Sequence, residues 1–267
     1  MTGISAALVK ELRDQTGAPM MDCKRALQET GGDIEAAKLV LREKGLAGAA
    51  KRSGRDTTEG KVGYRIGDDG KRGTMVAVGC ETEPVSNNDE FLAFAKKVLE
   101  TVEADGVGAE QSLEDERVAL VAKLGENIAI AGAARFTAVN GAIVEGYAHP
   151  PRNKIGVLVQ LRGGSQELGR KLAMHAAATP SQWIGREDVP DEVIQSEREI
   201  YLNSDEVQSK PEQAREKIVE GMLGKRFFAA EVLLDQPWIH ETGKSVGQAL
   251  SEEGAEVLEL ERFALAG

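Results

Sequence analysis

Polar residues of several chemical types are concentrated in the stretch CETEPVSNNDEF, residues 80–91. Glu81 and Glu83 flank Thr82 at strand-like spacing, which would place both carboxylates on one side of a strand, where such a pair acts as general acid and base. Cys80 adds a thiol, which becomes a nucleophile when its pKa is lowered. No partner for this chemistry lies nearby in the sequence. The plainer interpretation is a packed Cys80 and two solvated carboxylates.

The other groups capable of chemistry are three histidines and a second cysteine. The histidines, His149, His175 and His240, are not spaced like zinc ligands, so no metal site is expected. His175 lies among alanines in a helix-like segment, and Cys23 lies beside two basic residues that would lower its pKa. We expect packing roles for both, with Cys23 half-buried. The chain has neither a phosphate-binding glycine loop nor a nucleophile elbow, so no catalytic residue and no cofactor are expected.

Charge and composition exclude several functional classes. The formal net charge is −11, and because residues 1–55 carry +3, the rest carries −14. An acidic chain repels phosphate backbones, so direct nucleic-acid binding is not expected. The two cysteines are far apart in the sequence, which favours a reducing, cytoplasmic location. The N-terminus is not a signal sequence, and no run approaches the ~20 apolar residues of a membrane span, so no membrane association is expected.

The first part of the chain predicts a small helical domain. Helical spacing of apolar residues covers residues 4–15, 19–29 and 34–44. Gly17 suits the left-handed end of the first helix, and Asp33 suits the N-cap of the third. These features predict a three-helix domain over residues 1–45. The small, basic and polar residues 46–59 predict a linker.

The rest of the chain predicts an α+β fold, because strands and helices follow one another in irregular order. Strands are expected at residues 61–67, 74–83, 126–137, 142–149, 154–162 and 255–263. Helices are expected at residues 89–104, 112–125, 166–178 and from about 244. Two charged helices within about 186–225 have narrow apolar seams and predict a projecting antiparallel hairpin. We expect a core N-subdomain at 60–140 and a core C-subdomain at 141–267 that carries this hairpin.

Several long motifs resemble the bacterial elongation factor Ts family. They are LVKELRDQTGAPMMDCKRAL, GDIEAAKLVLREKG, ERVALVAKLGENIAI, KIGVLVQL, LAMHAAA and QPWIHETGKSVGQAL, and they extend from residue 4 to about 263. The resemblance implies a ubiquitin-associated-like (UBA-like) three-helix domain and a core of two α+β subdomains with antiparallel sheets and an inserted helical hairpin. It implies a guanine-nucleotide exchange factor, not an enzyme. Such a factor binds elongation factor Tu, disturbs its magnesium and phosphate site, and promotes GDP release during translation elongation.

The resemblance also implies which residues contact Tu. Members of the family carry Thr-Asp-Phe-Val at this position, and their Asp-Phe pair inserts into Tu near the magnesium. This chain has Thr82, Glu83, Pro84 and Val85 there. Glu83 retains the charge, and Pro84 replaces the aromatic wedge by a short, rigid one that biases Glu83 toward an extended backbone. The other implied contacts are Arg13, Met20, Met21, Lys24, Leu124, His149, Ile239 and His240. Adjacent methionines cannot both face one small core from the same helix turn, so the spacing leaves open one outward-facing methionine or two half-buried ones.

Three classes of function remain open at this point. The first is an exchange factor that acts by protein–protein contact. The second is a protein of the same fold that binds Tu without releasing GDP, because the wedge is altered. The third is an enzyme that uses Cys80 or the Glu81 and Glu83 pair. Pairing of two Tu·Ts complexes through the hairpin also remains open. The further C-terminal helical module of many family members is not expected after ERFALAG.

Overall fold

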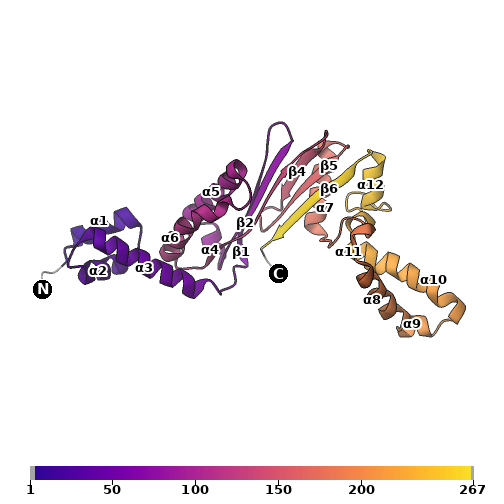
Figure 1. The fold of residues 1–267 in the computed structure, drawn as a ribbon, viewed down its shortest axis with the longest axis horizontal. Helices are drawn as coiled ribbons and strands as arrows, with labels where there is room; N and C mark the ends of the chain where they lie inside the picture. The colour runs from indigo at the N-terminus through magenta and orange to yellow at the C-terminus, as the bar shows by residue number, and fades with distance from the viewer. Residues whose placement is uncertain (1–3, 266–267) are drawn as a thin grey trace.

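The computed structural model describes residues 4–265 of the chain, which form an elongated molecule (Figure 1). A unit of three helices lies at one end and a helical hairpin at the other, with two antiparallel sheets and their covering helices between them. The predicted α+β class, the antiparallel sheets and the inserted hairpin are therefore confirmed. No helix within residues 4–265 combines the length and apolar character needed to cross a membrane.

The N-terminal unit consists of α1 (Ala6–Thr16), α2 (Met20–Glu29) and α3 (Ile34–Arg52). Gly17 ends α1 with φ +68°, and the Asp33 side chain accepts the N–H of Ala36 at the start of α3. Both end signals therefore act as the sequence predicts. The core of the unit is formed by Val9, Leu12, Cys23, Ala26, Leu27 and Ala37.

The third helix is longer than predicted, because it continues through residues 46–52 of the expected linker. Its last turns pack against α6 (Glu114–Leu124). Ala49 is buried there, and a Cβ placed on Gly45 would lie only 3.4 Å from Cβ of Ala122. The small residues that resembled a flexible linker thus allow two helices to approach closely.

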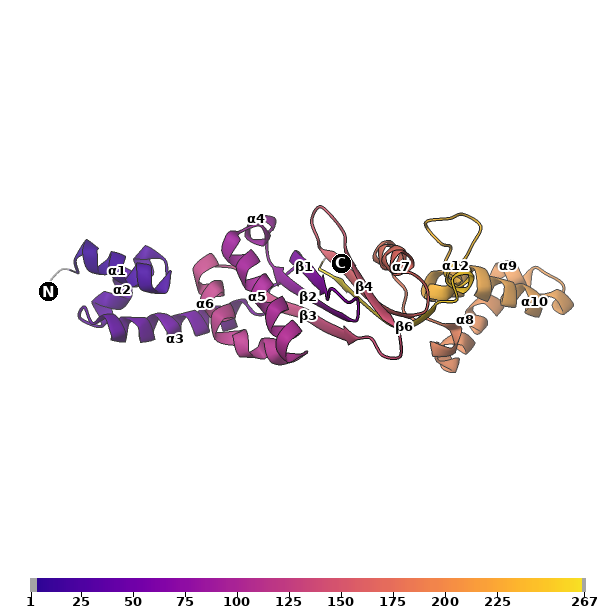
Figure 2. The same ribbon diagram turned by 90° about the horizontal axis from the view of Figure 1, so that it is seen from above.

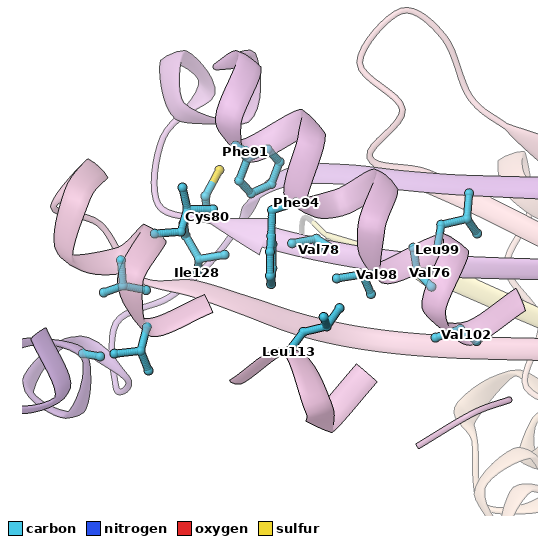
Figure 3. Close-up of a cluster of buried hydrophobic side chains, with 14 residues drawn as sticks. Val76, Val78, Cys80, Phe91, Phe94, Val98, Leu99, Val102, Leu113 and Ile128 are labelled. Atoms are coloured by element: carbon cyan, nitrogen blue, oxygen red, sulfur yellow. The ribbon is translucent and has the colours of Figure 1, made fainter. Parts of the chain in front are cut away.

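The first sheet contains β1 (Glu59–Ile66), β2 (Arg72–Cys80) and β3 (Ile128–Thr137), in the order β1-β2-β3. β2 is the central strand and is buried along nearly its whole length. Helical elements between β2 and β3 provide the side chains that cover one face of this sheet (Figure 3). They are α4 (Glu83–Ser86), α5 (Asp89–Asp105), the 3-10 helix η1 (Ala109–Leu113) and α6.

The second sheet contains β4 (Ile143–Ala148), β5 (Ile155–Arg162) and β6 (Glu256–Ala264), in the order β4-β5-β6. The helices α7 (Gln166–Ala178) and α12 (Val246–Glu252) pack against it. The two sheets also pack on each other. A Cβ on Gly156 would lie 2.4 Å from Cγ1 of Val62 in the first sheet, so only glycine permits this close approach.

The hairpin is formed by α8 (Asp191–Leu202), α9 (Asp205–Gln208) and α10 (Glu212–Met222). Arg198 of α8 forms an ion pair with Glu220 of α10. A buried cluster that includes Val207, Val219 and Met222 lies between its helices. Short elements return the chain to the second sheet, namely the π-helical turn η3 (Leu223–Phe228), α11 (Ala229–Glu231) and η4 (Leu233–Asp235), while η2 (Arg186–Asp188) precedes the hairpin.

Candidate partner-binding surface

The segment Thr82–Val85 leaves the sheet as a short helix. β2 ends at Cys80, and α4 begins at Glu83. The predictions of a strand through residue 83, with Glu81 and Glu83 on one side, and of an extended Glu83 are therefore wrong. Pro84 is compatible with this helix, since a proline is tolerated in the first turn, where its missing N–H would have no partner anyway.

The first three residues of this segment are exposed, and the last is packed against the protein core. Thr82, Glu83 and Pro84 are exposed. Val85 is half-buried and packs against the core cluster of the first sheet, and Ser86 is buried. The segment therefore presents one carboxylate and one proline ring to the surroundings from a fixed base.

The two carboxylates of this region have separate partners. Oε2 of Glu81 lies 3.2 Å from Nη1 of Arg55, and Oε1 of Glu81 accepts the N–H of Asn127 at 2.6 Å. Oε2 of Glu83 lies 3.4 Å from Nη2 of Arg152. Because each carboxylate is paired with a different cation, the two do not form a general acid and base pair.

The Cys80 thiol is directed into the hydrophobic core, beside Phe91 and Ile128 (Figure 3). Burial, together with the nearby Glu126 carboxylate, raises the pKa of Cys80 to about 12. The thiol also donates a hydrogen bond to the carbonyl of Thr82, at 3.3 Å. At neutral pH the sulfur is therefore protonated, and the packing interpretation of Cys80 is confirmed.

Cys23 is also more buried than predicted. It lies entirely within the core of the N-terminal unit rather than at its edge. Burial raises the pKa of its thiol and outweighs the hydrogen bond with Thr16, which lowers that pKa. The basic neighbours noted in the sequence therefore do not activate it.

The predicted contacts on α1 and α2 form an exposed surface. Met20 and Met21, in the first turn of α2, are 52% and 61% exposed. Both methionines are exposed, whereas the sequence left open one outward-facing methionine or two half-buried ones. Arg13 and Lys24 are exposed as well. Apolar, adaptable side chains and cations thus share this end of the molecule.

Leu124 ends α6 and is half-buried against the core cluster of the first sheet. The preceding residue, Lys123, forms an ion pair with Glu90 of α5, with 2.6 Å between Nζ and Oε2. Packing therefore holds the Leu124 side chain, and the ion pair of Lys123 fixes the end of α6 against α5. Only part of Leu124 is available to a partner.

Two loops of the second sheet carry the remaining predicted contacts. His149 follows β4 and is exposed, with its Nδ1 3.0 Å from the hydroxyl of Tyr147. Ile239 and His240 lie in the loop before α12, and both are exposed. Nε2 of His240 donates a hydrogen bond to the carbonyl of Lys171, at 2.9 Å.

The buried His175 of α7 holds this second loop in place. Its Nε2 lies 2.9 Å from Oε1 of Gln236, whose amide group donates to the carbonyls of Pro180 and Ala230. Oε1 of Gln236 is therefore an acceptor, so Nε2 of His175 carries the proton and Nδ1 accepts the N–H of Ile239, at 3.4 Å. Burial lowers the pKa of His175, which keeps the ring neutral as this arrangement requires. The sequence predicted packing for His175 but not this hydrogen bonding.

Several of these segments project on the same side of the molecule. Figure 2 shows α4, the loop between β4 and β5, and the loop before α12 along its upper edge. Nζ of Lys61 donates to Oδ1 of Asn87 and to the carbonyl of Arg152, at 3.0 and 3.2 Å. Together with the ion pair of Glu83 and Arg152, this joins α4 to the loop that carries His149. Sequence reasoning missed Lys61 and Arg152, because neither has a recognisable pattern.

Within residues 4–265 no group of three or more His, Cys, Asp or Glu side chains is arranged to hold a metal ion. The arrangement offers instead an extended surface with exposed apolar and charged side chains on rigid elements. Such a surface suits contact with another macromolecule.

Comparison with known proteins agrees with this description. The family described as Elongation factor TS matches residues 81–267. Elongation factor Ts of Methylococcus capsulatus is 41% identical over 271 residues, which cover 97% of this chain and 91% of the relative. Elongation factor Ts of Escherichia coli is 43% identical over 267 residues, which cover 98% of this chain and 92% of the relative. The chain belongs to the elongation factor Ts family.

Proposed function

We propose that this chain is a guanine-nucleotide exchange factor for elongation factor Tu, acting in the cytoplasm, and that Thr82–Val85 is the element that disturbs the magnesium and phosphate site of Tu. Family membership supports the role and the partner. The observation that carries the choice of element is the exposed Glu83 and Pro84 on a turn anchored by half-buried Val85. A charged and rigid tip on a fixed base is suited to enter a neighbouring protein.

The physical basis of exchange is a difference in affinity. A factor that binds nucleotide-free Tu more tightly than GDP-bound Tu lowers the affinity of Tu for GDP by the same ratio. A surface that bound both forms equally would shift nothing. The exposed residues of α1, α2 and the two loops supply docking, whereas Glu83 and Pro84 supply the difference between the two forms. Glu83 exchanges its partner Arg152 for groups near the magnesium of Tu.

An enzymatic role is disfavoured by two observations. The only sulfur in the Thr82–Val85 region is buried and has a pKa of about 12. Glu81 and Glu83 are each paired with a different cation, Arg55 and Arg152 respectively. Neither a nucleophile nor a free acid and base pair is therefore available near the segment, and the chain acts by contact rather than by chemistry.

Stopped-flow release of a fluorescent GDP from the cognate Tu tests the proposal. The wild-type chain should accelerate release, and Glu83→Ala should lose roughly tenfold or more of that acceleration, because hydrogen bonds to charged groups contribute about 1.5–3 kcal/mol. Glu103→Ala is the matched control, since this carboxylate is partly exposed and likewise paired with an arginine, Arg65, but lies on α5. It should release GDP at the wild-type rate.

The same assay distinguishes the docking alternative. Pro84→Phe restores an aromatic wedge at the position where the chain departs from the family pattern. If the wild type binds Tu without accelerating GDP release, while Pro84→Phe accelerates it, the chain is a docking protein with a blunted wedge and the exchange proposal is wrong.

A further inference from the structure

Thr82, the first residue of the Thr82–Val85 segment, is held by a residue from another part of the chain. Glu126 lies in the turn between α6 and β3. Its Oε2 accepts the backbone N–H of Thr82 at 3.0 Å, and its Oε1 accepts the Thr82 hydroxyl at 2.6 Å. Both oxygens of one carboxylate therefore bind one residue, and such two-point binding fixes orientation as well as distance.

The short helix that follows has little means of holding itself in place. Thr82 is the N-cap residue of α4, with an extended backbone at φ −130° and ψ 152°, yet its side chain caps no N–H of α4. An N-cap threonine normally accepts a hydrogen bond from the first turn. Here the hydroxyl donates to Glu126 instead. Because α4 has four residues, and isolated helices shorter than about 12 residues are marginal in water, its orientation depends on such outside contacts.

A second carboxylate strengthens the junction between the residues before α4 (Glu81 and Thr82) and the turn after α6 (Glu126 and Asn127). Glu81, next to Thr82, accepts the N–H of Asn127, next to Glu126, at 2.6 Å. Asn127 is buried, and its side-chain amide donates to the carbonyl of Arg55 at 2.9 Å. Each side of the junction thus donates a backbone N–H to a carboxylate of the other side. The turn after α6 is therefore a rigid support for the residues that precede α4.

We propose that Glu126 is a positioning residue for nucleotide exchange, which holds Thr82 so that α4 presents Glu83 and Pro84 to Tu in a fixed orientation. This inference rests on the proposed function. Glu126 acts through Thr82 and makes no contact with the nucleotide. Holding an element in its working geometry before binding lowers the entropic cost of reaching the productive complex. Loss of the carboxylate therefore lowers the rate of GDP release at saturating factor, whereas docking through α1, α2 and the loops is retained.

The test compares Glu126→Ala and Glu126→Gln with the wild type in GDP release from Tu, over a range of factor concentrations. Glu126→Ala should lower the saturating rate roughly tenfold, since two hydrogen bonds to a charged group are lost, and should change the affinity for Tu little. Glu126→Gln should restore part of the rate, because its single amide oxygen still accepts one of the two donors. Glu116→Ala is the matched control, since Glu116 is a carboxylate on the preceding helix α6 that is likewise held by a partner, Lys97.

A double-variant comparison identifies the contact. Thr82→Val removes the hydroxyl and keeps the shape of the side chain. If Glu126 acts through Thr82, the variant carrying both changes should be no slower than Glu126→Ala alone. Two effects that multiply would overturn the inference. So would a Glu126→Ala saturating rate equal to that of Glu116→Ala, or a loss of affinity with an unchanged rate, because the latter would make Glu126 a docking contact.

Hydrogen exchange in the free chain separates this inference from the proposed function. Amide exchange in residues 81–88 should be faster in Glu126→Ala than in the wild type, and unchanged in Glu116→Ala, with equal melting temperatures as a check on folding. If the wild type itself fails to accelerate GDP release, the proposed function is wrong, and this measurement still decides whether Glu126 orders α4. Unchanged exchange in Glu126→Ala would overturn the positioning role.

Discussion

The paired methionines at the start of α2 offer a quantitative test of the docking surface. Met20 and Met21 remain 52% and 61% exposed in the free chain. Complete burial of a methionine side chain contributes roughly 1.5–3 kcal/mol. About half of that, roughly 0.8–1.5 kcal/mol for each residue, is therefore still available on docking. The variant carrying both Met20→Ala and Met21→Ala should bind Tu roughly 15- to 150-fold more weakly.

The assay measures affinity for nucleotide-free Tu by calorimetry and the free energy of unfolding by urea denaturation. The free energy of unfolding should change by less than about 1 kcal/mol, because half of each side chain is already in water. At saturating concentrations the variant should release GDP at the wild-type rate, since α4 is unaltered. Val107→Ala is the control, because Val107 is equally exposed, at 59%, but follows the end of α5 that lies away from α4.

Three results would refute this reasoning. Wild-type affinity in the methionine variant would show that Tu does not dock on the start of α2. A loss of folding stability as large as the loss of affinity would show that the methionines belong to the core of the helical unit. Weaker binding of the Val107→Ala control to the same extent would show that the effect is not specific to this surface.

Three further predictions concern the core and the buried titratable groups. Phe91→Ala should lower the free energy of unfolding by about 3–5 kcal/mol in urea denaturation, since Phe91 is fully buried. Leu92→Ala, at the exposed neighbouring residue, should change the free energy of unfolding by less than about 1 kcal/mol. Similar values for the two variants would contradict the described packing. Burial lowers the pKa of His175, so the unfolded chain takes up a proton at a higher pH than the folded chain. The neutral ring therefore contributes its full share of stability above about pH 6.5. Below that pH the free energy of unfolding falls by up to about 1.4 kcal/mol per pH unit, until the folded-state pKa is reached. Unfolding at pH 7.5 and 5.5 should show this extra slope in the wild type and not in His175→Gln, and equal slopes would disprove it. In a Cys23→Ala background, Cys80 should react with a thiol reagent at pH 8 only after denaturation, since its pKa is about 12, and rapid reaction of the native chain would reopen the nucleophile hypothesis.

Most helices of this chain could be predicted because their signals are local. Gly17 and Asp33 mark helix ends through their own conformational preferences, and the apolar spacing around them marks the buried face. The end of α3 could not be predicted in this way. Its small residues are compatible with a flexible linker or with close helix packing, and only the presence of α6 against Gly45 and Ala49 selects the second.

The contact residues were predicted by resemblance to the family, and their local conformation was only partly predictable. Alternation favoured a strand through Glu83, whereas the chain turns into α4 after Cys80. Pro84 is compatible with either outcome, since its fixed φ suits both an extended chain and a first helical turn. Packing of Val85 into the core, together with the hold on Thr82, favours the turn.

The sequence by itself determined the class of fold, the family, and the types of side chain offered to a partner, because these follow from apolar periodicity and from motifs of consecutive residues. Tertiary structure decided how those side chains are held. Glu126 reaches Thr82 across 44 residues, and Arg152 reaches Glu83 from the second sheet. Such pairs have no local signature, since a carboxylate on a surface turn has the same sequence pattern whether it faces solvent or a backbone N–H. Only the folded chain brings the two partners together.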